Sequence, residues 1–406
     1  RQATTDPFDL ATLNEAGDLR ERGRRMTRRR SGLILPRPSR RGFLAGGLAL
    51  GASMTLPGCA YIRDDAAVDA PLPESAKAEI DGDLIYFNWA DYLAPRVLKG
   101  FQEEYGVKIV ESNYDSMEGM YAKLAAGNQY DIVFPGAKWV VKLRREGKLR
   151  AIDKAELQNA DQVFYSGSYF NDPWYDEGSQ VSVPFTVYKT GVGWRTDKVS
   201  TMTNSWEDLW NDEARGHIFT LDDQDEALAM AALILGYDVN TAKPSELEEI
   251  KKLLISQKEY LRAYSSDDIN NMMGGDAWIH HMWSGDFLYL RQGLADDPTQ
   301  FDFQSPSEGV PINSDAYVIP TNAKHPGTAM LFIDYLLRPE NAIKNMKYLY
   351  YPFPVKDALP AFAELAADVP ACNVEVSDLE NENVFRLLGA DETQRRAAVW
   401  TEVKAS

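Results

Sequence analysis

Residues 84–92, with the sequence LIYFNWADY, are the stretch from which the fold of this chain can be predicted. The apolar run at residues 84–87 is typical of a buried parallel strand. Open α/β sheets bind ligands at the carboxyl ends of such strands, and here that end carries Trp89, Asp91 and Tyr92. A carboxylate neutralises an ammonium group, and an aromatic face attracts a cation by roughly 0.5–2 kcal/mol. Two interpretations are open for the aromatic residues, a cation site and ordinary core packing.

The chain beyond this stretch alternates short apolar runs with helical patterns. We expect further strands at 108–111, 131–134, 191–194, 217–221, 262–264, 277–283 and 315–320, and helices at 94–105, 117–126, 139–145, 205–210, 244–261, 269–273, 326–337 and 339–348. This alternation predicts an α/β protein with right-handed βαβ units and a mostly parallel sheet. No glycine-rich phosphate-binding fingerprint stands at the turns, which disfavours a nucleotide-binding domain.

The charge of the chain is distributed unevenly. The formal net charge is −18 over 406 residues, but residues 1–58 hold 11 arginines, no lysine and 5 acidic residues. The rest of the chain is therefore even more acidic than the total suggests. Such a body repels nucleic acid and suits cationic ligands, although solubility is an equally good reason for it. A length of 406 residues allows two domains.

The basic N-terminal region has the pattern of an export signal. Residues 39–44, SRRGFL, match a twin-arginine motif, and a weakly apolar run, too short to span a bilayer, follows. The run ends in LPGC, which is similar to a lipobox, so we expect Cys59 to be lipidated. Pro57 departs from the residue usual at its position.

We therefore expect a signal at residues 1–58 and a tether at 59–79, giving a lipoprotein held to the membrane in the periplasm or at the cell surface. Met26 is a candidate start with a conventional arginine-rich n-region, in which case residues 1–25 are an overextended gene assignment.

Several segments resemble the spermidine/putrescine-binding proteins of ABC importers. They are NWADY at 88–92, KL at 123–124, YDIV at 130–133 and LFIDYLLRPE at 331–340, and the resemblance extends over about residues 80–404. It implies the two-lobe, type II fold of periplasmic binding proteins, with lobes that are discontinuous in sequence and a ligand cleft between them. Lobe I would comprise 80–188 and 313–358, and lobe II 189–312 and 359–404.

The resemblance also implies which residues face the cleft. These are Trp89, Asp91, Tyr92, Asp223, Glu226, Trp283, Asp286 and Asp315. Asp223 and Glu226 are one helical turn apart and can face the same way, although capping of a helix N-terminus is an alternative for Asp223. For Asp315 the alternative is a plain turn residue at the start of a strand. Trp283 and Asp286 repeat the pattern of an aromatic and a carboxylate at a strand end, and we expect both in a cation cage with Trp89 and Glu226.

Two places depart from the family pattern. Where relatives have an aromatic or hydroxyl residue after the third strand, this chain has Gly136, Ala137 and Lys138, and where relatives have an aromatic two residues before the carboxylate, it has Asn313. We include Lys138 among the candidate ligand-binding residues, with three interpretations. It points to solvent, it pairs with a cleft acid such as Asp91, or it binds a carboxylate of the ligand. In the last case the Asn313 amide could donate to that carboxylate too. We expect spermidine to bind more weakly than a shorter diamine or an amino-acid-like amine.

The leading hypothesis is a solute-binding lipoprotein that delivers a polyamine to the permease subunits of an ABC transporter. It implies a monomer without enzymatic activity, with no catalytic residue, cofactor, metal or nucleic-acid partner. The alternatives are a binding protein for a zwitterionic amine, an exported carboxylate-dependent hydrolase, and an iron-binding protein of the same superfamily. The hydrolase lacks support because the chain has no nucleophile elbow or zinc-helix motif. For iron, Tyr350 and Tyr351 are weak candidates.

Replacement of Arg40 and Arg41 by lysine is expected to leave the precursor in the cytoplasm, because the twin-arginine route is an address read by its receptor. Cell fractionation followed by immunoblotting measures this outcome. In the same assay, Cys59→Ser should give an exported product that is no longer attached to the membrane. Unaltered export of the double-lysine variant would contradict the assignment of the signal.

Overall fold

The computed structural model describes residues 71–163, 170–374 and 383–406. The predicted export signal at 1–58, the predicted lipidation site Cys59 and the first part of the predicted tether lie outside the described residues. Across the three described ranges, no helix is both long enough and apolar enough to cross a lipid bilayer.

The described strands form a mixed sheet in the order β2-β1-β3-β9-β4-β7-β5-β6, with β8 paired to β4. The strands are β1 (Leu84–Trp89), β2 (Ile109–Tyr114), β3 (Ile132–Val133), β4 (Ser182–Arg195), β5 (Ile218–Thr220), β6 (Leu261–Tyr264), β7 (Ile279–Trp283), β8 (Phe301–Gln304) and β9 (Ile312–Val318). β4 and β9 pair with the other named strands, and with each other, in antiparallel fashion only, so the prediction of a mostly parallel sheet is wrong. The reason is that β4 carries the chain from one group of strands to the other and β9 brings it back in the opposite direction.

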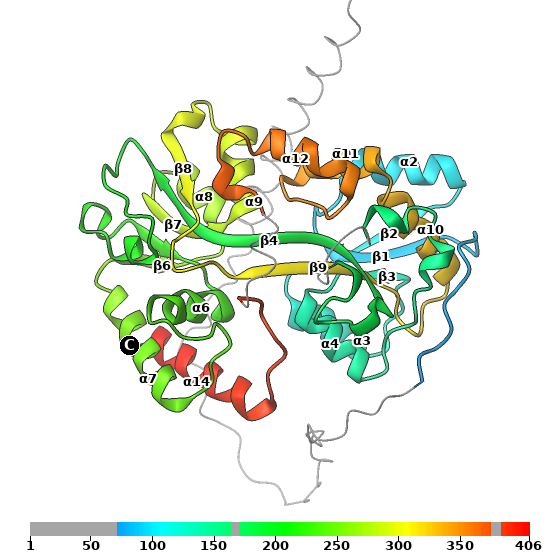
Figure 1. Ribbon diagram of the computed structural model, residues 1–406, viewed down its shortest axis with the longest axis horizontal. Helices are drawn as coiled ribbons and strands as arrows, with labels where there is room; N and C mark the ends of the chain where they lie inside the picture. The colour runs from blue at the N-terminus through cyan, green and yellow to red at the C-terminus, as the bar shows by residue number, and fades with distance from the viewer. Residues whose placement is uncertain (1–70, 164–169, 375–382) are drawn as a thin grey trace, which may run out of the picture. The chain divides into compact units, whose positions relative to one another are not determined.

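β4 is a single strand of 14 residues, although the sequence pattern predicts only a short strand at 191–194. Its first part pairs with β9 and its last part with β7 and β8, and Figure 1 shows β4 and β9 side by side between the two groups of strands. Gly191 permits the close pairing, because a Cβ atom there would lie 2.4 Å from the carbonyl oxygen of Gln304. A glycine within a strand often marks such a close approach of another backbone.

Helices flank both groups of strands (Figure 1). They are α2 (Pro95–Tyr105), α3 (Met117–Ala125), α4 (Ala137–Arg145), α6 (Gln224–Ile234), α7 (Pro244–Gln257), α8 (Asp268–Met273), α9 (Ser284–Leu288), α10 (Pro326–Leu336), α11 (Pro339–Leu349), α12 (Leu359–Leu365) and α14 (Ala390–Ala405). Proline stands in the first turn of α2, α7, α10 and α11, where its missing N–H costs no helical hydrogen bond. α7 ends earlier than predicted because Leu261 pairs with Ile218 as the first residue of β6.

Each group of strands has a hydrophobic core of its own. One cluster of buried side chains includes Phe87 of β1, Met120 of α3 and Val140 of α4. Another surrounds α6 and includes Leu228 and Trp400, the latter from α14. Separate cores joined by shared strands are what a two-lobed protein requires.

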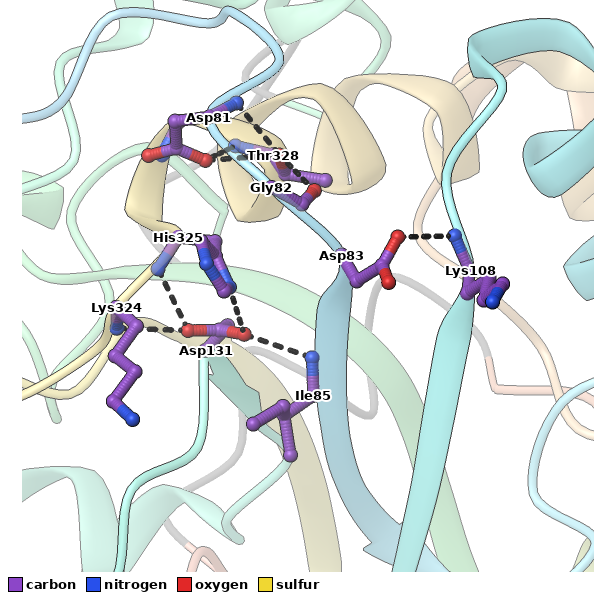
Figure 2. A network of polar contacts seen from close by, with 10 residues as sticks. Asp81, Gly82, Asp83, Ile85, Lys108, Asp131, Lys324, His325 and Thr328 are labelled. Atoms are coloured by element: carbon purple, nitrogen blue, oxygen red, sulfur yellow. Dashed lines mark hydrogen bonds and ion pairs between the residues drawn. The ribbon is translucent and has the colours of Figure 1, made fainter.

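A polar network fastens the amino ends of β1 and β3 to the start of α10 (Figure 2). Asp131 is 1% exposed and accepts hydrogen bonds from the backbone N–H groups of Ile85, Lys324 and His325 at 2.8–2.9 Å. Asp81 accepts two more from the first turn of α10. Both carboxylates satisfy backbone donors that would otherwise lack partners, so the network has a structural role.

Asp131→Ala is expected to lower the free energy of unfolding by about 3 kcal/mol or more. The substitution leaves three backbone donors unpaired, and each such loss costs about 1–3 kcal/mol. Urea unfolding followed by circular dichroism measures the change. Asp83→Ala is the matched control and should have a much smaller effect, because exposed Asp83 accepts one backbone bond, from Lys108 at 2.8 Å. Equal losses in the two variants would count against the role assigned to Asp131.

Candidate functional site: carboxyl groups and tyrosines along β4

The loop after β1 carries three predicted site residues. Trp89 ends β1, is half-buried, and packs edge-on against Tyr114 with ring centroids 4.7 Å apart. Asp91 has a φ of 58°, in the left-handed region that acidic residues adopt more readily than bulky ones, so the chain turns sharply there. The turn leads to Tyr92, whose hydroxyl reaches β9.

Asp315 lies in the middle of β9 and is 1% exposed, so the alternative of a plain turn residue is wrong. Its Oδ2 accepts hydrogen bonds from the hydroxyls of Tyr92, at 2.9 Å, and Thr186 of β4, at 3.4 Å. Its Oδ1 is buried and has no hydrogen-bond partner within the described ranges. A Cβ atom at Gly136 would stand 3.5 Å from Oδ1, so this oxygen faces a residue without a side chain.

Burial raises the pKa of Asp315 to about 7, and the hydrogen bonds from Tyr92 and Thr186 offset only part of that effect. A buried carboxyl group with one unsatisfied oxygen calls for an explanation, and a missing cation or donor is the usual one. Asp315 is therefore suited to receive a positively charged group.

Asp286 lies in α9, directly after β7, and accepts a hydrogen bond from the hydroxyl of Tyr351 at 2.8 Å. The ring of Tyr351 also contacts those of Tyr92 and Tyr188, with centroids 6.4 and 5.6 Å away. Tyr92 and Tyr351 thus form a bridge of aromatic rings between Asp315 and Asp286. Burial raises the pKa of both tyrosines well above the ordinary value, so both remain neutral donors.

Glu226, in the first turn of α6, is 3% exposed. The hydroxyl of Thr190 donates to its Oε2 at 2.7 Å. His281 Nε2 lies 4.0 Å from the same oxygen, but burial lowers the pKa of His281 to about 3, so the imidazole is neutral. Burial, together with the nearby Asp223, raises the pKa of Glu226 well above its usual value. Like Asp315, Glu226 is a buried carboxyl group that accepts a hydroxyl hydrogen bond and, among the described residues, forms no ion pair with a lysine or arginine.

Asp223 is the N-cap of α6, since its Oδ1 accepts hydrogen bonds from the backbone N–H groups of Asp225 and Glu226 at 2.9 and 3.1 Å. The capping alternative is therefore correct for Asp223. Burial and the neighbouring Asp225 charge raise the pKa of this carboxyl, so a cation nearby would still stabilise its ionised form.

Lys138, in the first turn of α4, forms an ion pair with Asp225 in the first turn of α6. Of the three interpretations of Lys138, pairing with an acid is therefore correct, but the partner is Asp225 rather than Asp91. Burial alone would raise the pKa of Asp225, but Lys138 and Arg396 outweigh it and keep this pKa below the ordinary value. Arg396 of α14 approaches Asp225 Oδ1 to 3.6 Å.

One face of β4 organises these contacts. Thr186, Tyr188 and Thr190 alternate along the strand, so their side chains share a face. Thr186 contacts Asp315, and Thr190 contacts Glu226. Between them, the ring of Tyr188 contacts that of Tyr351, whose hydroxyl binds Asp286. The β4 residues that lead to the three carboxyl groups are therefore about 7 Å apart along the strand, and we call Asp315, Asp286 and Glu226, in this order, the row of carboxyl groups. Half-buried Trp283 ends β7 opposite Thr190, next to the Glu226 end of the row.

The sequence analysis missed the residues that connect the predicted ones. Thr186, Tyr188 and Thr190 give a recognisable signal, because polar residues at alternate positions of a strand share one face. Asp225 was passed over although it lies between Asp223 and Glu226. Tyr351 was considered only as a weak iron ligand, and no local pattern points to its contact with Asp286, 65 residues away.

Comparison with known families shows what this chain is similar to. The family described as bacterial extracellular solute-binding protein matches residues 97–371. The spermidine/putrescine-binding periplasmic protein of Escherichia coli K12 is 34% identical over 288 residues, which are 69% of this chain and 80% of that protein. The putrescine/cadaverine-binding protein of Pseudomonas aeruginosa is 29% identical over 347 residues, which are 81% of this chain and 96% of that protein.

A solved structure agrees with these relatives. The spermidine/putrescine ABC transporter substrate-binding protein PotD of Streptococcus pneumoniae superimposes with a TM-score of 0.70 at 25% identity, covering 80% of this chain and 99% of that one. The predicted two-lobe, type II solute-binding fold is thereby confirmed. The assignment of individual residues to ligand binding stays a prediction.

In the absence of added ligand, the stability of the protein is expected to fall through Asp315 as the pH rises. The folded pKa of about 7 lies above the ordinary carboxyl value, so the folded state keeps a proton that the unfolded chain releases. This contribution is complete below the unfolded pKa of roughly 4 and is lost as the pH rises through about 7. Asp315→Asn removes the titration, so its unfolding free energy relative to wild type should rise by on the order of 2 kcal/mol between pH 5 and pH 8.

Urea unfolding of both proteins at the two pH values measures this difference. The exposed Asp212→Asn is the matched control and should differ from wild type by the same amount at both pH values. A difference between Asp315→Asn and wild type that does not depend on pH would show that Asp315 is already ionised when buried.

Proposed function

The chain belongs to the bacterial extracellular solute-binding proteins, and from this membership we propose that it captures a polyamine outside the cytoplasm for an ABC transporter. Members of this family bind solutes for transport and are not enzymes. The proposal is supported by the relatives described above, whose names give putrescine, cadaverine or spermidine as ligands. Delivery to the permease subunits of the transporter would follow capture.

The observation that carries the proposal is the row of carboxyl groups along β4. Asp315 and Glu226 are almost completely buried, and neither forms an ion pair with a lysine or arginine among the described residues. A buried carboxylate without a cation is costly, so burial raises the pKa of both groups, and a bound positive charge would stabilise their ionised forms. The ammonium groups of a polyamine supply such charges, and the rings of Tyr92 and Tyr351 supply apolar walls for the methylene chain between them.

The proposed mechanism is closure of two lobes around the ligand. We assign residues 80–188 and 313–358 to lobe I, and residues 189–312 and 359–404 to lobe II. Two contacts between the proposed lobes support this mechanism. The Tyr351 hydroxyl of lobe I binds Asp286 of lobe II, and Lys138 of lobe I pairs with Asp225 of lobe II. A ligand that contacts both lobes stabilises their closed arrangement.

The proposal includes export by the twin-arginine route and attachment to the membrane through Cys59. Its support is the SRRGFL motif and the lipobox-like LPGC sequence. The alternatives of the sequence analysis are not favoured. A zwitterionic ligand would need Lys138 for its carboxylate, and Lys138 is paired with Asp225.

Isothermal titration of putrescine into wild type and Asp315→Asn tests the proposal. The variant should bind putrescine more weakly by about 2–5 kcal/mol, because removing one partner of a desolvated charge pair typically costs that much. The exposed Asp212→Asn is the control and should bind as wild type does. If putrescine, cadaverine and spermidine all fail to bind wild type, the proposed function is wrong. If they bind and Asp315→Asn is unaffected, the ligand site lies elsewhere.

A further inference from the structure

Lys138 brings a positive charge to one end of the row of carboxyl groups. It lies on α4, in lobe I as proposed above, and it pairs with Asp225 on α6, in lobe II. Asp225 adjoins Glu226, the last carboxyl group of the row, in the first turn of the same helix. The Lys138 side chain is 34% exposed and that of Asp225 is 24% exposed, so the pair is only partly accessible to water.

The surroundings of Lys138 hold it in this position. Arg396, with a side chain that is only 2% exposed, lies 3.6 Å from the other oxygen of Asp225. Arg396 also donates to the backbone carbonyls of Val239 and Thr241, which hold its guanidinium group against the segment that follows α6. Asp225 thus stands between two cations, and its charge is taken up within the protein.

The field of Lys138 extends beyond its partner. Burial raises the pKa of both Asp223 and Glu226, and the positive charge of Lys138 offsets part of that rise in each case. An ammonium group placed at Glu226 would therefore approach another ammonium group in a poorly solvated region, where repulsion between like charges is strong. An ammonium group at Asp315 would meet no such repulsion from the described groups that affect the pKa of Asp315, because these are the neutral hydroxyls of Tyr92 and Thr186.

We infer that Lys138 is a built-in cation that limits how many ammonium groups the site accepts, so that the site holds a diamine more tightly than a triamine. The inference rests on the proposed function and specifies its substrate class. A triamine laid along the row of Asp315, Asp286 and Glu226 has to place one ammonium group beside Lys138. A diamine can occupy two positions of the row and leave that place empty.

Isothermal titration of putrescine and spermidine into the purified full-length protein tests the inference. Wild type should bind putrescine at least tenfold more tightly than spermidine. Lys138→Met, which keeps the length of the side chain and removes its charge, should reduce this preference at least fivefold, mainly through tighter binding of spermidine. Lys138→Arg keeps the charge and should keep the preference.

Lys142→Met is the matched control. Lys142 lies one turn further along α4 and is also 34% exposed, but it pairs with Glu146 of its own helix end. The Lys142→Met variant should leave the preference for putrescine over spermidine unchanged. Lys138→Gln provides the same test if the methionine variant fails to fold.

Two outcomes would overturn the inference. One is equal binding of the two amines to wild type, and the other is a preference that stays within twofold of wild type in both uncharged Lys138 variants. Failure of wild type to bind either amine would instead refute the proposed function, so the two hypotheses fail in different ways.

Discussion

The chain crosses between two groups of strands on β4 and returns on β9, and this pair of crossing strands determines where the polar residues of the candidate site can stand. Residues that alternate along β4 share a face, so Thr186, Tyr188 and Thr190 present their side chains in a fixed row. The pairing of β4 with β9 sets Asp315 opposite Thr186. A site built on paired strands is held more precisely than one built on loops, because the ladder of backbone hydrogen bonds fixes the spacing.

Two equally buried aspartates of this protein, Asp131 and Asp315, differ in their hydrogen bonding. Asp131 is buried but accepts three backbone hydrogen bonds, so both of its oxygens have donors within the protein and its role is structural. Asp315 is buried as deeply, yet one of its oxygens has two hydroxyl donors and the other has none in the part of the chain that the structure describes. An aspartate side chain thus has hydrogen-bond donors for both oxygens at position 131 and for only one oxygen at position 315. A buried carboxyl group with an oxygen that lacks a donor is stabilised more by an external cation than one whose oxygens are both hydrogen-bonded. Burial and hydrogen bonding therefore distinguish a candidate site better than acidic composition does.

The sequence predicts local features of this fold well and long-range ones poorly. The strand at residues 84–87 and the proline-led starts of α7, α10 and α11 follow from nearby residues, and the structure has them. The continuity of β4 and its antiparallel pairing with β9 do not follow, because they depend on which strands meet after the chain has crossed twice. For the same reason, the pairing of Lys138 with a residue 87 positions away could be proposed as a type of contact but not assigned to Asp225.

The first turn of α6 explains why counting acidic residues overstates the charge that a ligand has to carry. Three carboxyl groups stand there within four residues, and each has a different role. Asp223 caps the helix, Asp225 is paired with Lys138 and Arg396, and Glu226 faces Thr190. Only Glu226 has neither a backbone donor nor a cation of the protein as its partner among the contacts described. The positive charge that a ligand needs is therefore set by the carboxyl groups that the protein leaves without an internal cation.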